Sequence, residues 1–173
     1  MQLLRHLLSI LLLPFTVTVI VPAWLVRSAG GVRLGWRLPG AGTGLAVAAG
    51  VLLILGGVAM LARTIALFAT RGRGTLAPWD PPRRLVVTGV YRHVRNPMIS
   101  GVIAILAGET LLWGLPSVAW WAAIFAASNL IYIPLLEEPM LRDRFGAPYD
   151  DYRRNVPRWV PRLHPWTQDQ EPS

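Results

Sequence analysis

The sequence predicts an all-α integral membrane protein with about four transmembrane helices, five being the alternative count, and a C-terminal cytoplasmic helical cap. Hydrophobic residues make up 53% of the 173 positions and charged residues only 15%, whereas a soluble domain carries roughly 25% charged residues. The mean hydropathy is positive, and the apolar residues gather in runs long enough to cross a bilayer. An arginine-rich tail follows the last run and supplies the predicted cap.

Four apolar runs account for the predicted membrane helices. They cover Leu7–Val26, Thr43–Thr70, Met98–Trp113 and Val118–Leu136. The first run has a second interpretation as a signal peptide, because Arg5 precedes it and small residues follow it. Its apolar part is longer than a usual signal-peptide core, and Trp24 suits an interfacial anchor, so a retained span is favoured.

The third and fourth runs are joined only by Gly114–Ser117, which predicts a tight helical hairpin. Trp113, Trp120 and Trp121 flank this turn, as an aromatic belt at a membrane interface would. In the second run, Gly50, Gly56 and Gly57 allow close helix packing without requiring a dimer.

The distribution of arginine predicts the orientation of these helices. The hairpin turn carries no arginine, whereas the segments on either side of the hairpin hold Arg71, Arg73, Arg83, Arg84, Arg92 and Arg95, and Arg142, Arg144, Arg153, Arg154, Arg158 and Arg162. By the positive-inside rule, both basic segments and both chain termini lie in the cytoplasm. Arg27, Arg33 and Arg37 oppose this arrangement, and a partly re-entrant first run is the alternative.

The chain divides into four parts by composition. These are N-terminal membrane helices (1–70), a basic cytoplasmic loop (71–94), a helical hairpin with its cap (95–162) and a flexible tail (163–173). Leu85–Thr88 in the loop is a short strand or an extended segment. Glycines and prolines dominate the preceding Gly72–Pro82, which reads as irregular loop.

Proline and glycine predict how the fourth run ends. Pro139 would clash with the helix turn before it, so we expect the span to kink or stop at Glu137 and Glu138. Met140–Phe145 then forms a short interfacial helix that ends at Gly146. Pro148 opens another short helix.

Composition excludes several classes of chemistry. The chain has no cysteine, and all 17 of its basic residues are arginine, so thiol nucleophiles, zinc–thiolate sites and lysine Schiff bases are absent. We expect no metal. The net charge of +8 indicates topology signals and contact with anionic lipid rather than with nucleic acid. Gly40–Gly44 resembles a nucleotide-binding glycine motif, but a membrane run follows it and no strand precedes it, so it is read as a flexible turn.

Two polar clusters lie where apolar runs begin or end. Glu137 and Glu138 repel each other in a partly dry site, and nearby arginine or a cationic ligand would relieve that cost. Arg95 and Asn96 precede Pro97, where arginine forks and a helix N-terminus form a potential anion cradle. The alternatives are the polar end of a span for the acids, and a positive-inside signal for the basic cluster.

Glu109 is an acid inside the third run, roughly 18 Å from its start at 1.5 Å per residue. An intramembrane acid is a functional candidate. A structural ion pair with Arg63 and a position near the outer interface are the alternatives.

Taken together, these motifs resemble the isoprenylcysteine carboxyl methyltransferase and phospholipid methyltransferase superfamily. Its pattern is Arg-His-Pro-x-Tyr opening a membrane helix, a Glu-Glu pair after the next helix, and a tail with Phe-Gly, two tyrosines and Val-Pro-Arg. The matching residues here are Arg95, Asn96, Pro97, Glu137, Glu138, Phe145, Gly146, Tyr149, Tyr152, Val156, Pro157, Arg158, Pro161 and Arg162. Asn96 replaces the family histidine and Ile99 the tyrosine, which puts substrate class and activity in doubt.

The resemblance implies a methyltransferase of the bacterial inner membrane that uses S-adenosylmethionine from the cytoplasm and methylates a lipid or other hydrophobic acceptor. It implies a cofactor site formed by Arg95, Asn96, Pro97, Glu137, Glu138, Tyr149 and Tyr152, with Arg95, Glu138 and Glu109 as catalytic candidates. Arg95 would clamp the cofactor carboxylate, and a glutamate would meet its ammonium or ribose. The tyrosines would pack on adenine, close the cap or anchor the interface.

Two other functions remain open at this point. Sterol reductases share a related C-terminal architecture, and the Arg71–Arg84 segment would suit the 2′-phosphate of NADPH. A non-catalytic membrane subunit is the third interpretation, supported by Asn96 and Ile99.

Overall fold

A computed structural model describes residues 13–71, 85 and 87–167, and these are helical with no strand among them. The elements are the π-helical turn η1 (Thr16–Ile20), α2 (Val21–Ser28), the 3₁₀ turn η2 (Leu34–Arg37), α3 (Gly42–Arg71), the 3₁₀ turn η3 (Gly89–Arg92), α4 (Pro97–Trp113), α5 (Pro116–Tyr132), the π-helical turn η4 (Ile133–Glu137), α6 (Glu138–Phe145) and α7 (Ala147–Asn155). The all-α prediction is confirmed for these residues. Leu85 and Val87 lie outside any strand. Of the two predictions for this segment, a strand or an extended segment, the extended one remains.

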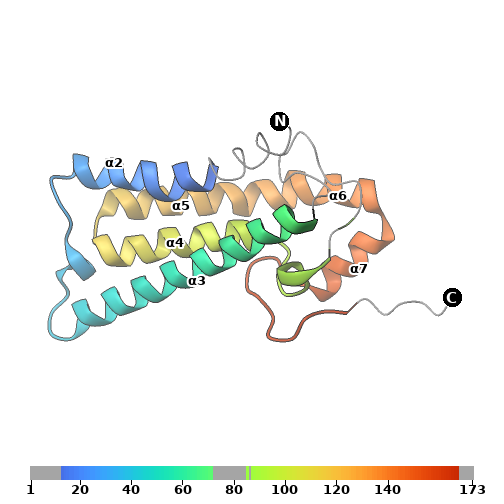
Figure 1. Cartoon of the computed structure of the whole chain (residues 1–173). Coiled ribbons are helices and arrows are strands. Elements are labelled where there is room, and N and C mark those ends of the chain that lie inside the picture. Colours follow the sequence, from blue (N-terminus) through green and yellow to red (C-terminus); the bar gives the residue numbers. More distant parts are fainter. Residues whose placement is uncertain (1–12, 72–84, 86, 168–173) are drawn as a thin grey trace.

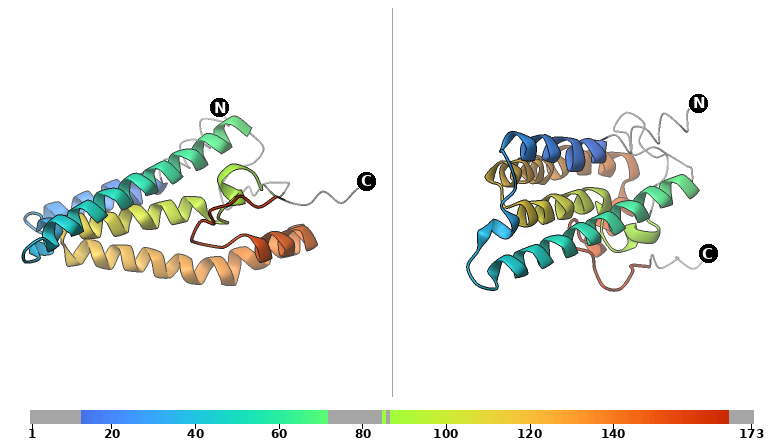
Figure 2. Two further views of the ribbon diagram at one scale, coloured as in Figure 1. Left: turned by 90° about the horizontal axis from the view of Figure 1, so that it is seen from below. Right: turned by 60° about the vertical axis from the view of Figure 1, so that its left-hand side comes forward.

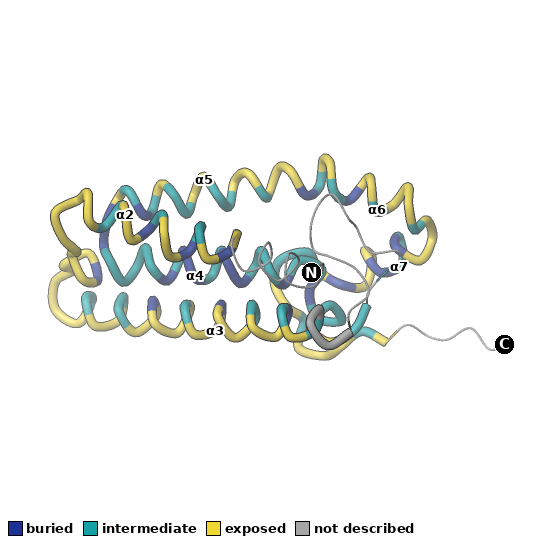
Figure 3. The backbone as a smooth tube through the Cα atoms, turned by 45° about the horizontal axis from the view of Figure 1, so that its top comes forward, coloured by how far each residue is buried: buried dark blue, intermediate teal, exposed yellow. Residues whose placement is uncertain are grey.

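The long helices lie side by side, with α4 between α3 and α5 (Figure 1). Both α3 and α5 turn exposed sides outward, and α4 carries more of the described buried residues than either of them (Figure 3). The short elements η3, α6 and α7 gather at one end of the bundle, and η2 lies at the other (Figure 2). We refer to these as the polar end and the hairpin end.

Within the residues that the structure describes, two helical segments are long and apolar enough to cross a membrane, Gly42–Leu67 and Pro116–Phe145. Only 11% of the most apolar window in either segment is buried, whereas the core helix of a soluble protein would be mostly covered. Leu13–Ser28 and Pro97–Trp113 are shorter apolar helices. Helix length and composition therefore support two spans and leave the predicted count of four or five as an expectation.

Four glycines bring α3 and α4 into backbone contact. A Cβ on Gly57 would lie 2.5 Å from the carbonyl oxygen of Gly101, and one on Gly108 would lie 2.5 Å from that of Gly50. Each helix thus contributes two glycines seven residues apart to one antiparallel contact. Only glycine allows this approach, which is how small residues pack helices where lipid removes the hydrophobic driving force.

The predicted hairpin between α4 and α5 is confirmed. Gly114 adopts φ 59° and its N–H donates to Thr110 at the end of α4, while Pro116 opens α5. The η2 turn packs against this hairpin, because the Arg33 N–H donates to the Trp113 carbonyl at 2.8 Å. The Trp36 indole donates to the carbonyl of Thr110 at 2.9 Å. The residues after Gly40 form a turn that leads into α3, as expected.

The helix that begins at Pro116 does not stop at the glutamates. The π-helical turn η4 contains Pro134 and ends two residues before Pro139, and at its end the Glu138 N–H donates to the carbonyl of Ile133 instead of to that of Pro134. A π-helical turn contains one residue more than an α-helical turn. The helix therefore continues instead of ending, and the side chains after the turn point in a different direction. It stops at Gly146, and α7 follows, as the sequence predicted.

Candidate functional site

The tail after α7 folds back over the start of α4 at the polar end. Main-chain N–H groups of Arg95 and Asn96 donate to the carbonyls of Pro157 and Arg158, at 2.9 and 3.3 Å. Further along, the Arg162 N–H donates to His93 O at 2.9 Å. The His93 Nδ1 lies 2.8 Å from the Arg162 carbonyl, and because a carbonyl only accepts, this nitrogen carries the proton. The segment before α4 is therefore held along its length by the tail.

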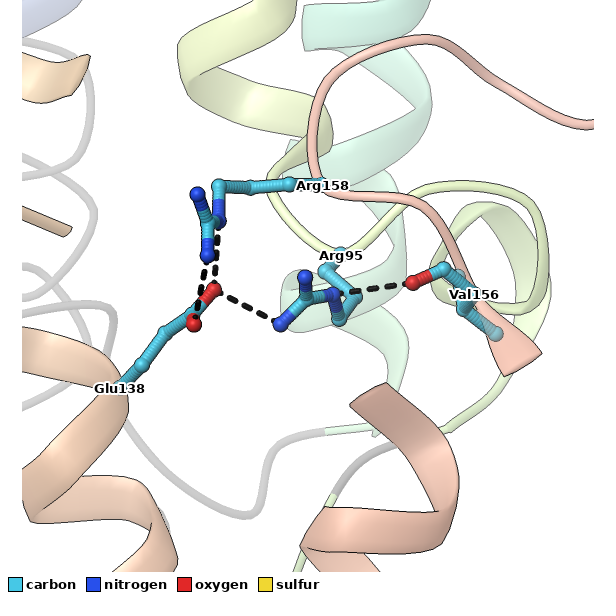
Figure 4. A network of polar contacts seen from close by, with 4 residues as sticks. All are labelled: Arg95, Glu138, Val156 and Arg158. Atoms are coloured by element: carbon cyan, nitrogen blue, oxygen red, sulfur yellow. Dashed lines mark hydrogen bonds and ion pairs between the residues drawn. The ribbon is translucent and has the colours of Figure 1, made fainter. Parts of the chain in front are cut away.

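A buried carboxylate lies at the centre of this arrangement. Glu138 Oε1 accepts from Arg95 Nη1 at 2.7 Å and from Arg158 Nε at 2.6 Å, and Oε2 accepts from Arg158 Nη2 at 2.8 Å (Figure 4). The Arg95 Nε donates to the carbonyl of Val156 at 2.9 Å. Glu138 is 4% exposed, Arg95 9% and Arg158 30%. We call these three side chains the Glu138 network.

The Glu138 network joins three parts of the chain that are distant in sequence: the residue before Asn96, the first residue of α6 and the tail. The fork of Arg158 matches the two carboxylate oxygens, which is the strong bidentate form of the arginine–carboxylate pair. The hydrogen bond to Glu138 is the main reason that the pKa of Arg158 is raised, so its charge is permanent. This network fixes the position of the tail over the start of α4.

The network also occupies groups that the sequence suggested for a cofactor. Arg95 and Glu138 were expected to meet the carboxylate and the ammonium of a ligand, but they are engaged with each other and with Arg158. Arg158 has no assigned role in the sequence prediction beyond its place in the tail motif. Arg158 could have been identified by asking which second cation, in addition to Arg95, would pair with a buried acid.

Glu137, the other acid of the pair, is placed differently. It is partly exposed and makes no ion pair within the described part of the chain. Its charge helps to raise the pKa of Tyr91, after burial and the neighbouring Tyr152. Asn96 precedes α4 without a side-chain capping bond. Glu137 and Asn96 are therefore polar side chains at the polar end that have capacity for a ligand.

The two tyrosines of α7 are buried. Tyr149 and Tyr152 are each 3% exposed and, with Val156, form the core of the cap, where the rings lie 6.3 Å apart. The Tyr152 hydroxyl donates to the carbonyl of Tyr91 at 2.7 Å. Burial raises the pKa of both phenols; the charge of Glu138 adds to this for Tyr149, and the charge of Arg95 opposes it. Their position inside the cap fits cap closure and differs from that of interface anchors.

The structure does not bring Glu109 to the Glu138 network. Glu109 lies twelve residues beyond Pro97 on α4, roughly 18 Å at 1.5 Å per residue, near the hairpin end. Its Oε2 is buried without a hydrogen-bond partner. Because Gly50 faces Gly108 and α3 runs antiparallel to α4, Arg63 lies about 20 Å further along α3. The two residues form no ion pair in the structure.

The site contains no metal-binding cluster within the residues that the structure describes, since no group of three His, Cys, Asp or Glu side chains converges there. The polar side chains of the predicted site at this end of the bundle are those of arginine, glutamate, asparagine and tyrosine. Such a set can bind a zwitterionic ligand and exclude water.

Two curated proteins are similar to part of this chain. Methanethiol S-methyltransferase 2 of Bradyrhizobium diazoefficiens is 38% identical over 77 residues, which are 43% of this chain and 27% of that protein. Methanethiol S-methyltransferase of Pseudomonas deceptionensis is 33% identical over 85 residues, 46% of this chain and 30% of that protein. The matched region thus spans less than a third of either relative. No solved structure matches the chain.

The remaining comparison covers more than half of the chain. Residues 45–148 match the phospholipid methyltransferase family. This region runs from α3 to the beginning of α7 and includes the glycine contact, the hairpin, Arg95 and both glutamates, while Arg158 lies beyond it. The chain belongs to the phospholipid methyltransferase family.

Proposed function

We propose that this protein is an integral membrane methyltransferase that takes its methyl group from S-adenosylmethionine and passes it to a hydrophobic acceptor. The observation that carries the proposal is the Glu138 network, which holds the tail over the start of α4. Beside it lies a second carboxylate, Glu137, which forms no ion pair with the residues that the structure describes. Family membership supports a methyl-transfer reaction and the need for a donor.

The polar end fits the charges of this donor, which has an ammonium, a carboxylate and a sulfonium. Glu137 is the carboxylate available for the ammonium or for the ribose hydroxyls, and a cationic ligand relieves its repulsion from Glu138. Asn96 supplies an amide, and Arg95, held by Glu138, keeps N–H groups for the carboxylate. Pro97 starts α4 beneath them, and Tyr149 and Tyr152 support the cap.

S-adenosylmethionine supplies an activated methyl group for in-line displacement. The chain's own contribution is to hold the acceptor in line and to exclude water, which the buried network and the tail accomplish. An ionised carboxylate or thiolate acceptor needs no base. A neutral thiol or an amine must lose a proton, and Glu137 could accept it only where the donor's ammonium does not occupy this carboxylate, whereas Glu109 lies near the hairpin end.

We infer that the acceptor enters from the bilayer between the helices. The proposed classes are a lipid headgroup or carboxylate and a small hydrophobic thiol. The thiol is supported by the two relatives, which are named for methanethiol. We place the protein in a bacterial inner membrane with the polar end in the cytoplasm, because arginines dominate that end.

The test is binding of S-adenosylhomocysteine to the detergent-purified full chain by calorimetry, followed by methyl transfer from labelled donor to a thiol, an ethanolamine lipid and a prenylcysteine. We expect Glu137→Gln to weaken binding at least about tenfold, a loss typical of a charged hydrogen bond. Asp143→Asn is the matched control, since Asp143 is an exposed acid of α6 outside the network. Absence of binding in folded wild-type protein would contradict the proposal.

A further inference from the structure

A second basic feature lies on the outer side of the cap, separate from the Glu138 network. Arg142, Ala147, Asp150, Arg153 and Arg154 line a hollow of about 220 Å³ between α6 and α7. We propose that this hollow binds the phosphate group of an anionic membrane lipid. The inference rests on the membrane location in the proposed function, but it concerns a different site.

The hollow has an excess of positive charge. Its lining holds three arginines and one aspartate, a net charge of +2. Arg142 pairs with Asp150 at 3.2 Å, which neutralises one arginine. Arg153 and Arg154 are exposed and form no ion pair with any residue that the structure describes. Two arginine forks directed to one hollow without an acid partner match the oxygens of a phosphate.

The depth of the hollow matches the headgroup layer. The helix Pro116–Phe145 has 30 residues, about 45 Å at 1.5 Å per residue, whereas the hydrocarbon core is about 30 Å thick. If the span begins at Pro116, roughly 20 residues cross the core, to about Leu136. Arg142 then lies roughly 9 Å beyond the core, in the headgroup layer.

The rest of the hollow stays close to that layer. Helix α7 turns back toward the bundle, so its last turn does not project away from the membrane (Figure 1). That last turn carries Arg153 and Arg154. Leu136 and Met140, which precede Arg142 along the same helix, are 55% and 61% exposed, and such side chains suit acyl chains. Neither of these two residues lines the hollow, so the lipid is favoured because the arginines of the hollow lie at the level of the headgroups.

The experiment uses the full chain in phosphatidylcholine nanodiscs that contain phosphatidylglycerol, with the retained anionic lipid counted by native mass spectrometry. We expect Arg153→Gln to lower phosphatidylglycerol affinity about fivefold, the contribution of one arginine near an anionic surface. Arg144→Gln is the matched control, because Arg144 is an exposed arginine in the last turn of α6 that does not line the hollow. We expect it to retain lipid as the wild type does.

Three results would overturn the proposal. Equal loss in the Arg144→Gln and Arg153→Gln proteins would show diffuse attraction, and no loss in Arg153→Gln would show that the hollow binds no lipid. Displacement of the lipid by soluble glycerol phosphate at equal concentration would assign the site to a soluble anion. Methyl transfer in nanodiscs of phosphatidylcholine alone tests the proposed function independently, since that membrane lacks the anionic lipid.

Discussion

Helix α4 is held in two places by opposite kinds of interaction. Along its length it meets α3 through Gly50, Gly57, Gly101 and Gly108, where carbonyls and α-carbons touch and no charge takes part. At its N-terminal end it is fixed by the Glu138 network, where a carboxylate with 4% exposure holds two arginines. The first contact depends on the absence of side chains, and the second on their complete pairing.

The two regions differ in the substitutions that they tolerate. In the glycine contact, an added methyl group meets backbone that cannot move aside, so the cost is steric. In the network, a removed group leaves charges without partners, so the cost is electrostatic and spreads to the tail. Added side-chain atoms therefore destabilise the glycine contact, whereas removed side-chain atoms destabilise the Glu138 network.

The largest effect is expected for Glu138→Ala. Removal of the carboxylate leaves Arg95, which is 9% exposed, without its partner. Breaking a buried pair from one side costs about 3 kcal/mol, and the tail loses its attachment to α6. Chemical unfolding in mixed micelles, followed by tryptophan fluorescence, measures the change. Asp143→Ala, an exposed acid on the same helix, should leave stability unchanged; an equal loss in both variants would argue against the network.

A smaller loss, about 2 kcal/mol from overpacking, is expected for Gly57→Ala. The new Cβ would lie 2.5 Å from the Gly101 carbonyl and 3.0 Å from the Ile105 nitrogen, and both are backbone atoms. Gly56→Ala is the control, because nothing lies within 4 Å of its Cβ position. Helix propensity alone makes that control slightly more stable. The same unfolding assay distinguishes them, and equal stabilities would refute the glycine contact.

Tyr152→Phe should cost about 1 kcal/mol, because it removes one hydrogen bond, to the carbonyl of Tyr91. The pKa of Tyr152 is raised in the folded protein, first by burial. Its folded state therefore holds the proton more tightly than the unfolded chain does, so this stability is complete below the ordinary tyrosine pKa of about 10 and is lost as the pH rises further.

The wild-type protein should accordingly lose stability above pH of about 10, and Tyr152→Phe should lose less over the same range. Unfolding measured across alkaline pH in micelles checks the difference between the two slopes. Parallel pH profiles would show that the phenol does not contribute through its proton.

The smallest effect is expected for Glu109→Gln. Glu109 lies roughly 18 Å from the start of α4, and sites more than about 10 Å apart are usually independent within about 0.5 kcal/mol. Affinity for S-adenosylhomocysteine should therefore stay within that margin of the wild type. A large loss would show that the acid near the hairpin end is coupled to the polar end, and the contrast between paired Glu138 and unpartnered Glu109 would then need another explanation.

Local signals predicted most of the helices. Proline opens α4 and α5, Gly114 and Gly146 end helices, and the apolar runs coincide with α3, α4 and α5. These signals act within a few residues, so a pattern can reveal them. The expected stop at the glutamates is wrong, because the helix continues through the π-helical turn η4, where the Glu138 N–H bonds to the carbonyl of Ile133 five residues before it.

The sequence predicted which residues lie at the site but not how their side chains pair. Arg95, Glu137 and Glu138 were identified as one polar site, and the structure brings them to the same end of the bundle. The different placement of the two glutamates had no sequence signal. Each residue turns the helix by about 100°, so the extra residue of η4 decides which acid meets Arg95 and Arg158.

The sequence by itself determined that this chain is helical, apolar and arginine-rich, and that its acids and arginines recur in the order of a methyltransferase family. The tertiary structure alone decided that Glu138 is paired, that Glu137 forms no ion pair with the described residues, and that Glu109 lies at the other end of α4. The physical reason is range: helix formation depends on neighbours a few residues apart, whereas the ion pairs join Glu138 to arginines 43 and 20 residues away. Only the folded chain sets those distances.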